Sequence, residues 1–536
     1  MFASVQALGL LLVVVIGLLH LRRLTSLAHK QDKDDTRILK TQPVFGIREE
    51  RFRWVRARLR SFTETSKWAF EGYEKYCKVN LPFAIPSLEH GLTVVIPPQQ
   101  IKKVYGLSES VLDVKQVQHE NMQLRWTFPD PHLHAEQLHI TVVRNQLTQN
   151  IPILAPRVAA EIEFGFERSW GYDGEWNEVR TWSSALRIIA GAANGAFCGL
   201  PLCRDVVFLD RLRDHAMSLF GGAIAMSCLP SALQRVFGPI LMIVSRFMAE
   251  RVMKRSRPIV RERLENTARL KADPDHEWTP PQDALQWIID ECYASPNREQ
   301  LDLGRVCERL LIANDISLLT TAFTAQNFIL DLYSSDPARG YVDALREECA
   351  DVLRESGGKW TPDAVENLRL VDAAIRESMR ISPLGSVLLP RKVLDPDGIV
   401  IGGWSVPVPR GTRIVVPVEP IHYDAKAYPE AHLYNPFRFV QPADNDNNEV
   451  VTWEKKQSFK VKSTVTLDES FLAFGVPGRN ACPGRFFALL ELKIFVANLL
   501  LNYEVEYLKS RPKPVHMMWV KYPSDANIRI RRRAGR

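Results

Sequence analysis

The sequence predicts a mainly α-helical protein with a minor β region, built as one large domain behind a single N-terminal membrane anchor. Most segments from about 135 to 378 carry the 3.6-residue apolar period of helices. Strand signals are few and clustered, with Gly and Pro between them. The 536 residues are 46% hydrophobic and 24% charged, a balance that supports a large core and excludes a disordered or linker protein.

The first 23 residues are predicted to form the anchor. Phe2 to Leu21 is almost wholly apolar, and as a helix it would rise about 30 Å, the thickness of a bilayer core. Arg22 and Arg23 follow the run and no basic residue precedes it, so positive charge lies on the cytosolic side and the rest of the chain stays in the cytosol. A cleaved signal peptide and a buried core helix are the alternatives.

Residues 24–536 are predicted to form the second unit, one large domain with a polar insertion at about 441–470. The segment Ala216 to Gln234 is uncharged, but serines and Pro230 interrupt it, so it is interpreted as buried helix and turn. The segments with helical periodicity include Leu138 to Leu154, Glu178 to Ala190 and Val306 to Leu332. The predicted strands are Leu92 to Ile96, Val387 to Val393, Ile399 to Val406 and Arg413 to Val418.

Charge and cysteine content limit the functional classes. A net charge of +7 is dilute over 536 residues, so no nucleic acid partner is expected. The eight cysteines are scattered without a C-x-x-C pair, which indicates a reducing compartment and neither a disulfide scaffold nor a zinc ribbon.

Cys482 has the sequence context of a metal-binding thiolate. A Gly- and Pro-rich loop, FGVPGRNACPG, leads directly into an apolar helix, whose first amides and dipole favour thiolate over thiol. A thiolate in a glycine-rich loop can serve as an axial ligand of an iron centre, because glycines let a flat cofactor approach the backbone. An ordinary buried cysteine is the alternative.

The stretch GRNACPGRFFA resembles the haem-thiolate loop of cytochromes P450, most closely the microsomal enzymes of filamentous fungi. The resemblance implies Cys482 as the axial ligand of the iron of haem b, with Gly478, Arg479 and Phe474 also at the haem. The sequence departs from the family pattern at two positions. Phe474 stands eight residues before the cysteine where the family has an aromatic seven before it, and Asn480 stands where a basic residue often meets a haem propionate.

A second motif, AAIRESMRISP, places Glu377 and Arg380 on one helix face, where they can pair. Alone this spacing usually means a solvated ion pair. It lies after a helix start at Thr361-Pro362 and before the strand cluster, the order seen in the family. The resemblance adds Arg438 from YNPFRF and implies a buried structural network of the three residues.

A third resemblance lies in the long helix from about Leu303 to Tyr333, where the family carries an acid and a threonine at the oxygen-binding face. It implies Thr320, followed by Thr321, as catalytic hydroxyls that relay protons. Leu319 stands at the acid's position, and Asp315 lies about 140° round the helix from Thr320. Threonines that bond only to the preceding helical turn are the alternative.

Two arginines are candidates for the haem propionates: Arg391, in the strand region, and Arg144, in VVRNQLTQN. Solvent-exposed arginines without such a role are the alternative. His132, His134 and His139 do not form a metal set, since no carboxylate or cysteine accompanies them at suitable spacing. The resemblance also implies that residues 383–389 and 317–321 line the substrate pocket.

The resemblance implies the cytochrome P450 fold and a monooxygenase that inserts one atom of O2 into a lipophilic small molecule, such as a terpenoid, polyketide or alkaloid intermediate. Electrons would come from NADPH through NADPH-cytochrome P450 reductase, with Arg479, Arg485 and Lys493 as docking candidates. The anchor implies the endoplasmic reticulum membrane and contact with membrane lipid. A haem-thiolate isomerase or dehydratase that needs no reductase, and a non-catalytic membrane-anchored haem protein, remain alternatives.

Overall fold

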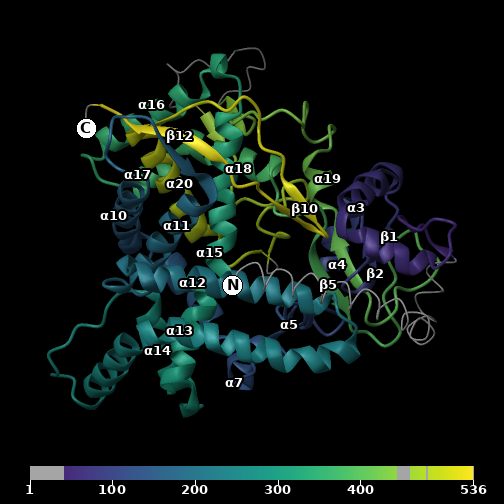
Figure 1. Cartoon of the computed structure of the whole chain (residues 1–536), viewed down its shortest axis with the longest axis horizontal. Coiled ribbons are helices and arrows are strands. Elements are labelled where there is room, and N and C mark those ends of the chain that lie inside the picture. The colour runs from purple at the N-terminus through teal and green to yellow at the C-terminus, as the bar shows by residue number, and fades with distance from the viewer. Residues whose placement is uncertain (1–40, 443–458, 479–480, 535–536) are drawn as a thin grey trace, which may run out of the picture.

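The computed structural model describes residues 41–442, 459–478 and 481–534, and most of this chain is helical (Figure 1). The predicted anchor, residues 1–23, lies outside the described residues. The α-helices are α3 (Arg53–Lys75), α4 (Pro98–Tyr105), α5 (Lys115–Asn121), α6 (Leu124–Thr127), α7 (Pro131–Ala135), α8 (Leu138–Arg144), α9 (Gln146–Gln149), α10 (Ile151–Trp170), α11 (Thr181–Phe197), α12 (Val206–Ser227), α13 (Ser231–Ala272), α14 (Ala284–Ala294), α15 (Leu303–Tyr333), α16 (Tyr341–Glu355), α17 (Pro362–Asn367), α18 (Arg369–Ile381), α19 (Val418–His422) and α20 (Arg485–Asn502).

Helix α15 is the centre of the larger hydrophobic core. It contacts α8, α11, α12, α13, α18 and α20, and Figure 1 shows it crossing the helical half of the molecule. Its N-terminus is capped by Asp302, which accepts a hydrogen bond from the Arg305 amide at 3.0 Å. Because neighbours surround it, most of its residues are buried. The predicted bounds of this helix are confirmed.

The β region forms a second, smaller core around a five-stranded sheet. Its strand order is β1 (Phe83–Ser87), β2 (Gly91–Val95), β6 (Arg413–Val416), β5 (Leu388–Val393) and β3 (Leu112–Asp113). The pair β2–β6 is parallel and the other neighbours are antiparallel. The remaining strands are β4 (Asn177–Arg180), β12 (Asn527–Arg532) and β9 (Tyr503–Val505) in one sheet, the hairpin β10 (Val515–Met517) and β11 (Val520–Tyr522), and the pair β7 (Val440–Pro442) and β8 (Phe459–Val461).

Three predicted elements differ from the structure. Residues 399–406 form no strand; a single bridge joins Ile399 to Val408, because Gly402, Gly403 and Pro407 interrupt any ladder. Residues 138–154 contain a short helix, a one-turn helix and the start of α10, rather than one helix. Residues 178–180 belong to strand β4, which pairs with β12 at the far end of the chain.

Two further segments bear on the predicted organisation. Residues 216–234 are the end of α12, a short turn and the start of α13, as predicted. Within the described ranges, no helix is long and apolar enough to cross a bilayer. In the predicted polar insertion, β7 and β8 pair on either side of residues 443–458, which lie outside the described residues.

The end of that insertion packs on the core. Asp372 of α18 accepts hydrogen bonds from the Thr464 amide at 2.7 Å and the Ser463 hydroxyl at 2.8 Å. Thr464 is fully buried. Residues 463–464 are therefore part of the folded domain and not a solvated loop.

Candidate haem-thiolate site

The loop before α20 closes as a short hairpin that fixes Cys482. The Cys482 amide donates to the Phe474 carbonyl at 2.7 Å, and an isolated antiparallel bridge joins Gly475 to Ala481. Gly475 and Gly478 have φ values of 102° and 89°, which side chains rarely adopt. A Cβ built on Gly478 would meet nothing within 4 Å. The backbone at Gly478 is therefore open to a flat ligand lying against it.

Cys482 lies just ahead of the first turn of α20, which begins at Arg485. Of the eight cysteines, all within the described ranges, only Cys482 is exposed. Although the residue is accessible, protein atoms packed around its thiol partly desolvate it and raise its pKa, while the Gly484 amide and the Arg485 charge act in the opposite direction. The amide that favours thiolate is thus that of Gly484, just before the helix, and desolvation outweighs it in the free thiol. An accessible sulfur at a rigid helix start is a suitable iron ligand.

The middle of α15 has one open face. Ile316 is 40% exposed and Thr320, one turn later, is also exposed, although most of this core helix is buried. Thr321 and Leu319 are buried. The Thr321 hydroxyl donates to the Ser317 carbonyl at 3.0 Å, and the Thr320 hydroxyl has a longer contact with the same carbonyl at 3.4 Å. Of the two threonines, only Thr320 is therefore accessible to a ligand.

Asp315 does not replace the missing acid on that face. It is 3% exposed, and its Oδ1 accepts from His215 Nδ1 of α12 at 3.0 Å. Burial raises the pKa of Asp315, and the His215 contact opposes this shift. Asp315 therefore joins two helices inside the core and has no access to the open face.

Glu377, Arg380 and Arg438 form one buried network. Arg380 Nε and Nη2 donate to the two Glu377 oxygens at 2.7 and 2.8 Å, and Arg438 Nε contacts the same oxygens at 3.0 and 3.1 Å. The Asn435 amide adds a bond to Glu377 at 3.1 Å. Glu377 and Arg380 are fully buried, so the structure brings together the three residues that the resemblance grouped. Thr361 also caps α17 as predicted.

His422 connects this network to the haem-thiolate loop, and the sequence interpretation missed it. Its Nδ1 donates to the Arg380 carbonyl at 3.2 Å, and its Nε2 accepts from the Leu472 amide at 3.0 Å. Arg380 Nη1 donates back to the His422 carbonyl at 2.6 Å. In the neutral ring, one imidazole nitrogen is thus a hydrogen-bond donor and the other an acceptor. A proton on Nε2 would remove the acceptor and break the bond to Leu472. No short motif surrounds His422, so only the fold reveals it.

Acidification is expected to destabilise the protein through His422. Burial lowers its pKa to about 3, so between pH 6.5 and 3 the unfolded chain binds a proton that the folded chain does not. Neutral His422 therefore makes its full contribution to the free energy of unfolding above pH 6.5. That contribution is lost as pH falls, and at pH 5.5 the loss is about 1.4 kcal/mol. The free energy of unfolding, measured with denaturant, should fall less between pH 7.5 and pH 5.5 in His422→Gln than in wild type. His432→Gln, a change at an exposed histidine, is the control and should lose as much free energy of unfolding as wild type. If His422→Gln also lost as much as wild type, His422 would not be the group responsible.

The two propionate candidates lie in different settings. Arg391 of β5 is 8% exposed, and its guanidinium lies 5.1 Å from the Tyr105 ring centre. Tyr105 is itself fixed by a hydrogen bond from its hydroxyl to the Leu389 carbonyl at 2.5 Å. Arg144 is exposed at the last residue of α8. Arg391 is the more rigidly held candidate, and both remain predictions.

Of the three residues predicted to dock the reductase, Lys493 is wrong. It is 6% exposed, and its Nζ lies 3.3 Å from Asp372 Oδ2 and 3.2 Å from the Val365 carbonyl. A buried, paired lysine cannot dock a partner. Arg485 donates to the Cys482 carbonyl at 3.0 Å. Arg479 lies outside the described residues.

The histidines singled out in the sequence form no metal site. His139 is buried beside Arg309 Nη1 at 3.4 Å, and burial lowers its pKa to about 3. Among the described residues, no group of three metal-ligating side chains occurs.

The residues present fit a haem. Cys482 supplies one accessible sulfur, Gly478 leaves space beside the backbone, and α15 opens one face at Ile316 and Thr320. Haem held by a cysteine sulfur defines a class of oxidoreductases.

Comparison with known proteins identifies the family. The cytochrome P450 family model matches residues 233–527. Cytochrome P450 monooxygenase okaG of Penicillium ochrochloron is 41% identical, over 92% of this chain and 94% of the relative. Cytochrome P450 monooxygenase gloP of Glarea lozoyensis is 34% identical, over 92% and 91%. The chain belongs to the cytochrome P450 family, and it is a haem-dependent monooxygenase with the mainly helical fold of that family.

Proposed function

We propose that this monooxygenase oxidises a lipophilic intermediate of fungal secondary metabolism, such as a terpenoid, polyketide or alkaloid, with electrons from NADPH through a flavoprotein reductase. The observation that carries the proposal is the accessible Cys482 sulfur at the start of α20, in a chain whose relatives are fungal monooxygenases. Haem held by a cysteine thiolate supplies the reductive activation of dioxygen.

The residues around Cys482 then have separate tasks in this proposal. The hairpin bond from Cys482 to Phe474 fixes the direction of the sulfur. The Thr320 hydroxyl, on the open face of α15, can pass a proton toward that face. Arg391 and Arg144 are the proposed partners of the two carboxylates of the haem.

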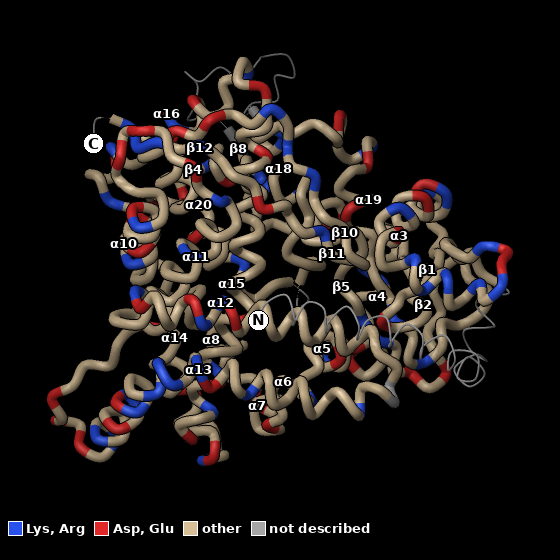
Figure 2. The backbone as a smooth tube through the Cα atoms, viewed as in Figure 1, with Lys and Arg blue, Asp and Glu red and all other residues tan. Residues whose placement is uncertain are grey.

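We also propose that the protein is held at the endoplasmic reticulum membrane by its first 23 residues, with the domain in the cytosol. An apolar stripe on α13 supports contact with lipid. Val236, Ile240, Ile243 and Phe247 are 55–66% exposed and follow one another at intervals of three or four residues, so they share one helix face. Elsewhere basic and acidic residues are interspersed along the chain (Figure 2).

Dependence on NADPH and reductase tests the reaction type. The full chain with reductase, NADPH and a panel of lipophilic terpenoids, polyketides and alkaloids should consume NADPH only when a substrate is present. One atom of ¹⁸O₂ should appear in the product, measured by mass spectrometry. The buried Leu319 at the acid's position keeps a reductase-independent isomerase as the rival. Turnover without NADPH would establish the rival, and Cys482→Ala should be inactive in either case.

A further inference from the structure

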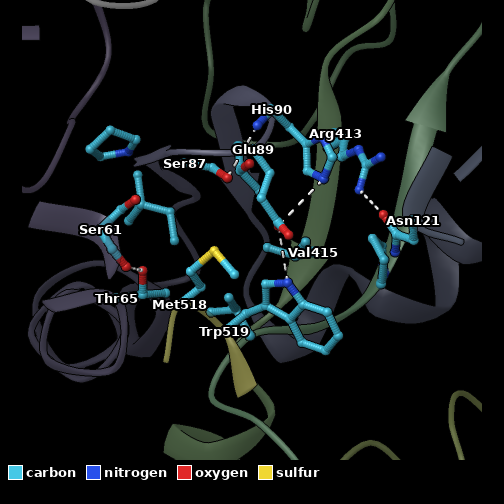
Figure 3. Close-up of a pocket in the computed structure, with 15 residues that line it drawn as sticks. Ser61, Thr65, Ser87, Glu89, His90, Asn121, Arg413, Val415, Met518 and Trp519 are labelled. Carbon is cyan, nitrogen blue, oxygen red and sulfur yellow. Dashed lines mark hydrogen bonds and ion pairs between the residues drawn. The ribbon is translucent and has the colours of Figure 1, made fainter. Parts of the chain in front are cut away.

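A small cavity lies between α3, the turn joining β1 to β2, and the turn joining β10 to β11 (Figure 3). Its volume is about 90 Å³, room for several waters or one compact head group, since a single water needs roughly 10–15 Å³. Val387 lines it, so the cavity borders the segment 383–389 that is predicted to contact substrate. The site therefore belongs to the substrate side of the molecule, apart from Cys482.

The β1–β2 turn is held rigidly against α3. Arg58 donates from Nε to the Ser87 carbonyl at 3.1 Å and from Nη2 to the Leu88 carbonyl at 2.6 Å. The Leu88 amide donates to the Ser61 hydroxyl at 2.9 Å. The position of the next residue, Glu89, is thus fixed by its neighbours before any ligand arrives.

Glu89 directs its carboxylate into the cavity, as Figure 3 shows. Its side chain is 6% exposed. Oε2 accepts from the indole Nε1 of Trp519 at 3.1 Å and lies 3.5 Å from His90 Nε2. Oε1 accepts no hydrogen bond from any residue of the described ranges. The cavity therefore offers one open acceptor beside an indole ring.

Two cations near Glu89 donate their hydrogen bonds to other residues. Arg413 is directed away from it, donating to Asn121 at 2.6 Å and to Glu120 at 2.8 Å. Lys392 bonds the same Glu120. Burial lowers the pKa of His90 well below its usual value, so this ring is neutral. Burial raises the pKa of Glu89, while the Trp519 hydrogen bond and the charge of Arg413, which also lines the cavity, oppose this shift.

We propose that this cavity binds the protonated amine of a nitrogen-containing substrate, with Glu89 Oε1 as its counter-ion and the Trp519 ring beside it. A carboxylate next to an indole is suited to an ammonium group, because the ion pair and the cation–π contact act together. The inference rests on the proposed function, since it selects the amine-bearing class among lipophilic substrates.

Binding of a matched pair of probes to the full-length holoenzyme tests the proposal. The probes are (4-phenylbutyl)trimethylammonium, whose quaternary nitrogen cannot ligate iron, and the neutral isostere in which carbon replaces that nitrogen. Isothermal titration calorimetry of the wild type should give at least about tenfold tighter binding of the cation, equal to 1.4 kcal/mol. Glu89→Gln should weaken binding of the cation by about the same factor and change the affinity for the neutral probe by no more than about twofold.

Glu71→Gln is the matched control, because Glu71 is a half-exposed carboxylate on α3. It should retain the full preference for the cation. Glu89→Asp keeps the charge and should retain part of the preference for the cation over the neutral probe. This variant provides the test if Glu89→Gln fails to fold. Equal binding of the two probes to wild type, or an unchanged preference in Glu89→Gln, would overturn the proposal. The assay uses neither NADPH nor reductase, so a failure of the proposed reaction is seen separately.

Discussion

Replacing Cys482 by alanine is expected to abolish the haem-thiolate signature of the protein and all monooxygenase activity. Cys482 is the only exposed cysteine among the eight, and its sulfur lies at a start of α20 fixed by the bond to Phe474. No other described cysteine could take its place, since six are buried and Cys228 is only partly accessible. The measurement is the absorption spectrum of the reduced protein with carbon monoxide, in which wild type should give a strongly red-shifted Soret band.

The control for that experiment is Cys228→Ala. Cys228 is the next most accessible cysteine, and its Sγ lies 3.9 Å from Met518 Sδ, in a part of the fold away from α20. This variant should keep the red-shifted band. An unshifted band in folded wild-type protein, or loss of the band in Cys228→Ala rather than Cys482→Ala, would show that another residue binds the iron.

Replacing Glu377 by glutamine should destabilise the fold more than any other single change discussed here. The variant leaves Arg380, fully buried, and Arg438 without the carboxylate that both of them pair with. Removing one partner of a buried ion network typically costs about 3–5 kcal/mol. Arg380 also bonds the His422 carbonyl, so the loss should extend to the haem-thiolate loop. Denaturant unfolding and the yield of haem-loaded protein measure the two effects.

Glu366→Gln serves as the comparison, because it changes an exposed carboxylate on the neighbouring helix α17. It should alter the free energy of unfolding by less than about 0.5 kcal/mol. If Glu377→Gln were as stable as Glu366→Gln and bound haem normally, the network would not have the structural role given to it.

Local patterns in the sequence were sufficient where one element carries the information. The 3.6-residue period predicts α15, and the i,i+3 spacing pairs Glu377 with Arg380. They were insufficient where the partner lies far along the chain. The alternation in 399–406 suggested a strand, but a strand needs a neighbour, and within the described fold Ile399 finds only Val408.

The same limit explains the site residues. His422 carries no motif, and its role follows only from the separate approach of the Arg380 carbonyl and the Leu472 amide. Lys493 was taken for a surface charge because lysines are mostly exposed, yet Asp372 and the end of α17 enclose it. Glu89 follows a strand in an ordinary turn, and the indole that marks it as a binding group comes from Trp519.

The parallel pairing of β2 with β6 has a consequence for synthesis on the ribosome. Thr93 pairs with Arg413, so at 5–20 residues per second β2 waits roughly 15–60 s for its partner to be made. During that interval its buried, apolar residues and one of its edges lack their final cover. Nascent chains that halt before residue 413 should therefore be the forms most in need of chaperones.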